Sequence, residues 1–232
     1  MTILTQRWNH FISTAPSWIP PDVDTLVVVP HPDDESLSVG GLIATQRRRG
    51  RSVRIVAVTD GEAAYPSRCH PDDLARLRRH EQDQALATLG VASSDIVRLG
   101  LPDGGVAAHE DDLANELGEL VHGMGLVVGP WQHDHHTDHE ATGRATERAA
   151  RGRDVTLAHS LFWAWHHTDP ELANPASLVA LDLDDELFDR RREAIACHRS
   201  QLTDVVAPRM LHPDDIESAT WAREHYMLNA TT

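Results

Sequence analysis

The chain has 232 residues, with 21 basic and 36 acidic side chains and a formal net charge of −15 at pH 7. Every basic residue is an arginine, which excludes Schiff-base lysine enzymes and the Walker-type phosphate loop. The acidity argues against a nucleic-acid partner, because neutralising phosphates needs a basic surface.

Apolar runs alternate with helical patterns along the chain. In chain order the patterns predict strand 25–29, helix 36–49, strand 53–59, helix 71–89, strand 95–101, helix 111–122, strand 126–129, helix 140–151, strand 157–165, strand 177–183, helix 185–200 and helix 214–225. This alternation is typical of an α/β fold with a Rossmann-like, mostly parallel sheet and helices on both faces. We expect an irregular N-terminal arm at 1–20 and a single domain at 21–232.

The rest of the composition places the chain among intracellular proteins. No stretch approaches the roughly 18 apolar residues of a membrane span, and the amino terminus lacks a signal-peptide pattern. We therefore expect a cytoplasmic location without stable membrane insertion. Cys69 and Cys197 form neither a metal-type pair nor a disulfide framework.

The string His-Pro-Asp-Asp occurs three times, at 31–34, 70–73 and 212–215. The second and third copies precede helical patterns, where proline and acidic residues suit the first turn. Helix capping explains those two copies. The first copy directly follows the buried strand 25–29, at the sheet edge where α/β proteins bind ligands. We therefore expect the chemistry at the first copy.

A second polar cluster follows the strand at 126–129. Four histidines and two aspartates fall within residues 133–139. Imidazole and carboxylate are common metal ligands, so this density at a strand end indicates a metal site.

These motifs together resemble those of a known family. The pairing of PHPDDE at 30–35 with HTDH at 136–139 resembles the PIG-L/LmbE-like superfamily of zinc-dependent N-acetylglucosaminyl deacetylases. Other segments also resemble motifs of this family: 59–62, 99–105, 198–201, and the predicted helix that contains Arg78 and Glu81. The resemblance runs from about residue 24 to residue 201. Thr137 stands where a proline is often found.

The resemblance implies a role for each of six residues. The implied zinc ligands are His31, Asp34 and His139. Asp33 would act as general base and later as general acid. His136 would stabilise the oxyanion, and Asp138 would orient His136 through a hydrogen bond and favour its protonated form.

These roles form a consistent hydrolytic mechanism. Zinc with three protein ligands lowers the pKa of a bound water to about 7. Asp33 would take a proton from that water and return it to the departing amine. We therefore expect a metal-dependent hydrolase that removes an N-acetyl group from an amino-sugar-containing small molecule. Zinc is the expected metal, and iron(II) is the alternative.

Other residues near the strand ends are candidates for binding the sugar. Glu62, Arg68 and Asp103 are candidates to bond sugar hydroxyls, and Arg68 would either do so or pair with a neighbouring acid on the surface. Trp131 would either face the sugar or pack beneath its loop. Trp163 and Trp165 would share one face of the strand 157–165. The sequence leaves four histidines without an assigned role: His133, His135, His166 and His167.

Three other functions compete with this prediction. The same site would suit an amidase of a thiol-sugar conjugate or of another acyl amide. Two histidines and a carboxylate also hold iron(II) in non-haem oxygenases, although Asp33 and His136 would then have no role. A dinucleotide-binding module would need a glycine fingerprint, which the turn at 31–41 lacks. The oligomeric state stays open between a monomer and a homo-oligomer.

Overall fold

Strand β1 (Thr25–Val29) is a run of five buried residues, most of them β-branched. Such a run suits a strand that is covered on both faces. Alternate residues of β1 point to opposite faces: Val27 and Val29 enter one apolar core, whereas Leu26 and Val28 enter another. The computed structural model describes residues 3–65 and 67–228.

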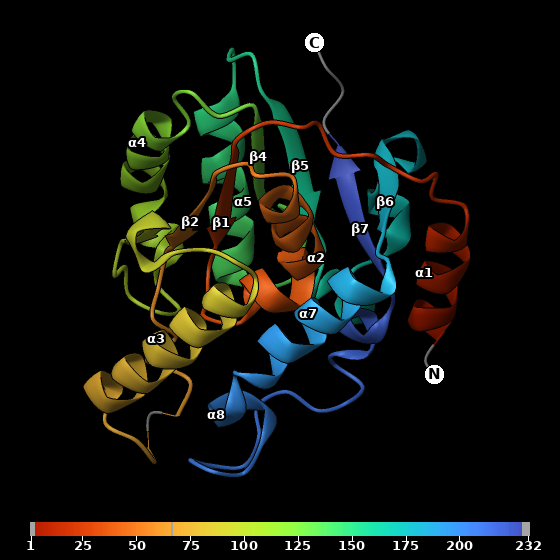
Figure 1. The fold of residues 1–232 in the computed structure, drawn as a ribbon. Coiled ribbons are helices and arrows are strands. Elements are labelled where there is room, and N and C mark those ends of the chain that lie inside the picture. The colour runs from red at the N-terminus through yellow and green to blue at the C-terminus, as the bar shows by residue number, and fades with distance from the viewer. Residues whose placement is uncertain (1–2, 66, 229–232) are drawn as a thin grey trace.

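Seven strands form a single sheet in the described residues, in the order β3-β2-β1-β4-β5-β7-β6 (Figure 1). The other strands are β2 (Val53–Ala57), β3 (Ile96–Arg98), β4 (Leu126–Pro130), β5 (Thr156–Ser160), β6 (Leu178–Asp182) and β7 (Arg223–Leu228). The first five strands pair in parallel, and β7 runs antiparallel to both β5 and β6. The carboxyl ends of β1 to β5 therefore meet at one edge of the sheet.

Helices cover both faces of this sheet. On one face lie α2 (Asp34–Arg48), α3 (Pro71–Thr88) and α7 (Asp185–Ala196); on the other lie α4 (Glu110–Leu120) and α5 (Thr137–Ala150). The shorter α6 (Ala164–His167) and α8 (Arg199–Leu202) follow β5 and α7. The predicted α/β fold, with a mostly parallel sheet and helices on both faces, is confirmed. Within the described residues, no helix has both the length and the apolar character of a membrane span.

The expectation of an irregular N-terminal arm is wrong. Helix α1 (Ile3–Ser13) occupies much of the segment 1–20, of which residues 1–2 lie outside the described part. Trp8 on α1 is buried, and its ring makes edge-on contacts with Trp131 and Trp165. This segment packs because aromatic side chains bury a large apolar area. The boundary with the domain at 21–232 stays a prediction, and residues 66 and 229–232 lie outside the described part.

The end of the chain also differs from the sequence prediction. The segment predicted as helix 214–225 forms a short 3-10 helix (Glu217–Thr220) and then β7. The hydrophobic pattern concealed this strand because two of its buried residues, Glu224 and His225, are polar. Glu224 is buried in an ion pair with Arg191, 3.1 Å away.

Two other predicted elements are too long because the chain turns within them. The strand predicted at 157–165 ends at Ser160, and α6 begins at Ala164, so Trp163 and Trp165 do not share a strand face. The helix predicted at 185–200 breaks at Cys197 and His198 into α7 and α8. Both breaks bring side chains to the carboxyl edge of the sheet, where tertiary contacts outweigh local propensity.

Candidate active site and metal centre

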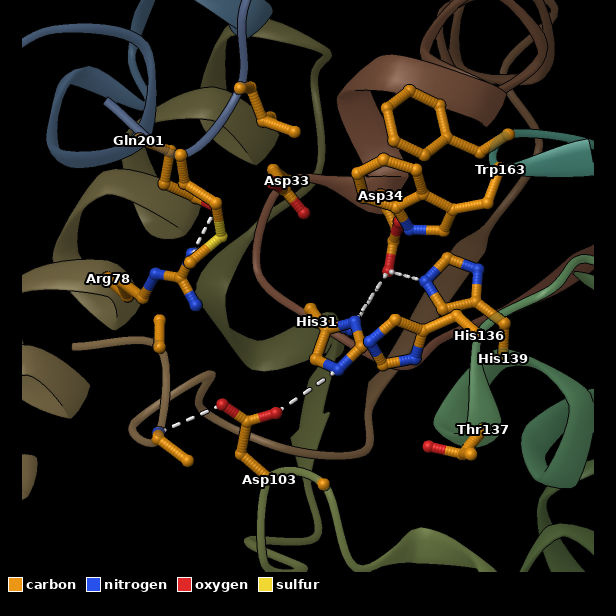
Figure 2. A pocket seen from close by; sticks show the side chains of 16 residues that line it. His31, Asp33, Asp34, Arg78, Asp103, His136, Thr137, His139, Trp163 and Gln201 are labelled. Carbon is orange, nitrogen blue, oxygen red and sulfur yellow. Dashed lines mark hydrogen bonds and ion pairs between the residues drawn. The ribbon is translucent and has the colours of Figure 1, made fainter. Parts of the chain in front are cut away.

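The polar segments after β1, β3 and β4 meet around a cavity of about 300 Å³ at the carboxyl edge of the sheet (Figure 2). The first segment contributes His31, Asp33 and Asp34, and the later ones contribute Asp103, Gly104, His136, Thr137 and His139. The remaining walls come from Ala63, Ala64, Arg78, Phe162, Trp163, Gln201, Met210 and Leu211. The structure thus brings the two motifs of the sequence analysis into one pocket.

The predicted metal ligands lie against one another. Asp34 Oδ2 lies 3.5 Å from His31 Nδ1 and 3.4 Å from His139 Nε2. The same oxygen accepts a hydrogen bond from the backbone N–H of His31 at 3.0 Å. His136 is close as well, because His31, His136 and His139 each place a ring nitrogen within 4.8 Å of the other two.

The chemistry of this donor set fits a zinc ion. His139 Nε2 is buried, and no hydrogen-bond partner for it exists among the described residues. A buried polar nitrogen without a partner is destabilising unless something binds it. Two imidazoles and one carboxylate, with further groups behind the rings, are a donor set that zinc uses.

The carboxylate of Asp138 holds His31 rather than His136, which corrects the expectation from the resemblance. Its Oδ2 lies 3.2 Å from His31 Nε2 and accepts the N–H of Gly104 at 2.7 Å. Its Oδ1 accepts the N–H of Val106 at 3.2 Å. Asp103 Oδ1 also approaches His31 Nε2, at 3.3 Å. Burial lowers the pKa of His31, but bonds to Asp103, Asp138 and Asp34 outweigh it and raise that pKa well above its usual range.

His136 caps the start of α5 with its ring. Its Nδ1 accepts the backbone N–H of Asp138 at 3.2 Å. Burial, and then the positive charges of His31 and His139, lower the pKa of His136 to about 4. The expected protonated form is therefore disfavoured. Because Nδ1 is an acceptor, the single proton of the neutral ring belongs on Nε2.

Asp33 sits in a strained backbone conformation beside the predicted ligands. Its φ is 143°, in a region that non-glycine residues rarely adopt. Glu35 supports this conformation, because its Oε2 accepts the N–H of Asp33 at 3.2 Å. Gln201 adds a hydrogen bond to Pro32 O at 2.5 Å. Burial, and then the charge of Asp34, raise the pKa of Asp33 to about 7.

A buried network lies behind Asp33. Glu35 Oε1 pairs with His198 Nε2 at 2.9 Å, and Glu35 Oε2 accepts a hydrogen bond from Gln82 at 2.9 Å. Arg78 donates to Gly61 O at 2.7 Å and also bonds the side chain of Gln201. Arg78 thus presents a positive charge on the side of the pocket opposite His136 (Figure 2).

The structure divides the four candidates for sugar contacts. Asp103 lines the pocket. Glu62 lies behind it, because its Oε1 accepts the N–H of Asp103 at 2.9 Å. Arg68 is exposed and does not line the pocket. Trp131 is buried against Trp8, so it packs beneath its loop and offers no face to a sugar.

The unassigned histidines and the repeated motif lie elsewhere. The rings of His135 and His167 stack 4.7 Å apart, and neither lines the pocket. At the second motif copy, His70 caps α3, as expected, by accepting the N–H of Asp72 at 3.3 Å. The third copy forms a turn in which His212 N–H donates to Asp215 Oδ2 at 2.8 Å. A short 3-10 helix follows it instead of the expected α-helix.

Sequence reasoning missed several residues of the site. Asp134 is fully buried behind His139, and Gln201, Met210 and Leu211 line the pocket. Asp134 belongs to the polar cluster at 133–139, but the sequence does not show whether an aspartate in such a cluster points into the protein or toward solvent. The other three come from the segment after α7, which only the fold brings to the pocket.

Comparison with known proteins assigns the chain to a family. The sequence profile described as "PIG-L: GlcNAc-PI de-N-acetylase" matches residues 26–150. Over 210 residues the chain is 30% identical to a Bacillus subtilis (strain 168) protein named "Probable N-acetyl-alpha-D-glucosaminyl L-malate deacetylase 2", covering 86% of this chain and 93% of that protein. The chain therefore belongs to the PIG-L family of de-N-acetylases, as its motifs predicted.

Solved structures support the same fold. The crystal structure of a deacetylase of the A40926 pseudoaglycone superposes with a TM-score of 0.63 at 27% identity, covering 80% of this chain and 84% of that one. A 4-carboxy-2-hydroxymuconate hydratase from Pseudomonas putida KT2440 superposes with a TM-score of 0.62 at 17% identity, covering 88% and 95%. That second likeness concerns the fold alone, because one fold can carry different reactions.

Proposed function

We propose that this protein is a metal-dependent N-deacetylase that converts an N-acetylglucosamine-containing small molecule into acetate and the free amine. One observation carries the proposal. Asp34 Oδ2 lies within 3.5 Å of a ring nitrogen of both His31 and His139, and Asp33 lines the same cavity. The names of the Bacillus subtilis relative and of the pseudoaglycone deacetylase support the same reaction.

His31, Asp34 and His139 would hold the metal. Zinc bound there would supply Lewis acidity toward the acetyl carbonyl and a water of lowered pKa. Iron(II) accepts the same two-histidine, one-carboxylate donor set and is the alternative metal. The two histidines would bind through different ring nitrogens, because Nδ1 of His31 and Nε2 of His139 face Asp34.

Asp33 is the proton carrier in this proposal. Its carboxylate takes a proton from the water that attacks the acetyl carbonyl, and it later gives that proton to the nitrogen of the departing amine. Asp33 suits both steps because its pKa of about 7 lies near neutral pH, so either form is accessible. A bound cation would move that pKa downward, toward the basic form.

His136 would stabilise the oxyanion as a neutral donor. Its Nδ1 is occupied by the N–H of Asp138, so the Nε2 proton is the one available to the substrate. A neutral imidazole held at a helix start can polarise a carbonyl, and one well-placed donor is worth about 3–4 kcal/mol. Asp138 contributes to this through its backbone, whereas its carboxylate holds His31.

The polar wall opposite His136 would bind the sugar. Arg78 and Asp103 present a guanidinium and a carboxylate to the pocket, and both groups bond sugar hydroxyls well. Phe162, Trp163 and Leu211 form an apolar wall that suits the acetyl methyl or an aglycone. The two proteins named above are named for deacetylating different molecules, an N-acetylglucosaminyl L-malate and a pseudoaglycone, so the proposed substrate is defined by its acetylated amine and not by one aglycone.

The experiment that tests this function measures acetate release by the zinc-loaded protein. The substrate panel holds N-acetylglucosamine glycosides with neutral, acidic and apolar aglycones, together with longer acyl amides and a thiol-sugar conjugate. Acetate release from the acetylated glycosides, abolished by a chelator and restored by zinc, is the expected result. Preference for the longer acyl amides would favour the alternative amidase, and turnover that survives the chelator would contradict a metal-dependent enzyme.

A further inference from the structure

Asp134 is fully buried between the metal centre and the wall of the pocket. Its Oδ2 lies 2.8 Å from Nδ1 of His139. Its Oδ1 accepts two backbone N–H groups, from Phe162 at 3.0 Å and from Ala164 at 2.9 Å. These two groups flank Trp163, which lines the pocket. One carboxylate therefore joins a candidate metal ligand to the segment that forms the apolar wall.

The contact with His139 decides which ring nitrogen carries the proton. A carboxylate only accepts hydrogen bonds, so the hydrogen in the bond to Asp134 belongs to Nδ1 of His139. The neutral ring then has its lone pair on Nε2. This is the buried nitrogen that faces Asp34 at 3.4 Å and has no hydrogen-bond partner among the described residues.

We propose that Asp134 is a positioning residue that keeps His139 in the tautomer able to bind the metal. The proposal rests on the proposed function only in taking His139 as a metal ligand. Carboxylates behind ligand histidines fix ring orientation and raise ligand basicity, and their loss weakens metal binding about 10- to 100-fold. Through Phe162 and Ala164, the same carboxylate also fixes the segment of Trp163 relative to the metal.

The substitution Asp134→Asn separates this role from a purely structural one. Both N–H groups of 162 and 164 need an acceptor, so the amide oxygen of the new side chain takes the place of Oδ1. The amide NH₂ group then faces His139 and donates to Nδ1. That arrangement preserves the packing but favours the ring proton on Nε2, and metal binding must then displace it, which lowers zinc affinity.

The test compares three proteins in the zinc-loaded and zinc-free states: wild type, Asp134→Asn, and Asp112→Asn as a control. Asp112 is exposed on α4, so its substitution removes the same charge at the surface. A competing chromophoric chelator measures zinc affinity, and ¹⁵N NMR of the neutral histidine rings reports the tautomer. We expect about 10- to 100-fold weaker zinc binding and a proton on Nε2 of His139 for Asp134→Asn alone.

Two results would overturn this proposal. One is wild-type zinc affinity in Asp134→Asn, and the other is a proton on Nε2 of the neutral His139 ring in the zinc-free wild type. The second measurement needs no variant, so it decides the matter even if Asp134→Asn fails to fold. Zinc binding without acetate release in the wild type would contradict the proposed function and leave the role of Asp134 intact.

Discussion

The carboxylate of Asp138 lies 3.2 Å from Nε2 of His31, on the side of the ring opposite Asp34. Asp134 stands in the same relation to His139. His31 and His139 thus each have one ring nitrogen facing Asp34 and the other in contact with a buried carboxylate. Such pairs orient ligand rings in metalloenzymes.

Replacing Asp138 by asparagine should weaken zinc binding by about 10-fold, because the His31 ring loses one of its two carboxylate acceptors and keeps Asp103, whose Oδ1 lies 3.3 Å from Nε2. It should also lower the free energy of unfolding by about 1–3 kcal/mol, since the N–H of Gly104 or Val106 is left without a partner. Chelator competition and urea denaturation measure the two effects. Unchanged zinc affinity would show that the carboxylate of Asp138 does not position His31 for the metal.

Asp33→Asn should keep zinc and lose about 10²- to 10⁴-fold in kcat, because the amide cannot take a proton from water. Asp72→Asn is the matched control, since Asp72 occupies the corresponding position in the second copy of the motif and is exposed on α3. Its turnover should equal that of the wild type. Equal losses of zinc and turnover in Asp33→Asn would contradict a general-base role.

Asp33→Gly should be more stable than Asp33→Ala by about 1–2 kcal/mol, because glycine accepts a φ of 143° without strain. Both variants lack the carboxylate, so the difference isolates the backbone. At Asp72, in the first turn of α3, the order of stability should reverse, so that Asp72→Ala is more stable than Asp72→Gly by up to about 1 kcal/mol. Urea denaturation of the four proteins tests this, and alanine being the more stable residue at both positions would show that Asp33 is unstrained.

His139→Ala should release the metal, whereas His133→Ala should keep it. The two histidines belong to the same polar cluster, but His139 is buried against Asp34 and His133 is exposed. Elemental analysis after dialysis gives the zinc content of each protein. Full occupancy in His139→Ala would remove that residue from the ligand set.

The buried pair of Glu35 and His198 should make stability depend on pH. Burial opposes both charges, but their mutual attraction raises the pKa of His198 above 6.5 and lowers that of Glu35 below 4.5. The contribution of His198 is therefore complete below pH 6.5 and lost as pH rises through its folded pKa. That of Glu35 is complete above pH 4.5 and lost as pH falls through its folded pKa.

Both contributions are complete between pH 4.5 and pH 6.5, and this range is the pH window of the pair. Within this window, His198→Gln should lower the free energy of unfolding by about 3 kcal/mol, since Glu35 keeps a hydrogen bond but loses its counter-charge. The difference from the wild type should shrink as pH rises above the window. Urea denaturation across this pH range measures it, with the metal state matched between the proteins. A difference that grows with pH would contradict a charged His198.

The inner part of the sheet was predictable because its signal is local. Continuous apolar runs place β1, β2 and β4 between two layers of helices, and Gly50 and Gly90 mark the ends of α2 and α3. Strand β7 was not predictable, because Glu224 is buried through its contacts with Arg191 and the N–H groups of Gly41 and Leu42. The hydrophobic periodicity of a sequence does not reveal contacts between residues that lie far apart in the chain.

The candidate site was predictable to a similar extent. The motifs identified the residues that meet in the cavity, because their positions after strands place them at one edge. They did not show which carboxylate faces which ring. The family resemblance pairs Asp138 with His136 and implies no role for Asp134, whereas the fold directs the carboxylate of Asp138 to His31 and that of Asp134 to His139.

Strand β7 also has a consequence for how the protein is made. Among the described strands it is the last in chain order, yet it lies between β5 and β6, and its Glu224 anchors α2, the helix that begins with Asp34. A growing chain on the ribosome therefore exposes two open strand edges until residues 223–228 emerge. Open edges invite intermolecular pairing. Translation arrest before that point would yield an aggregation-prone fragment in which α2 lacks its anchor.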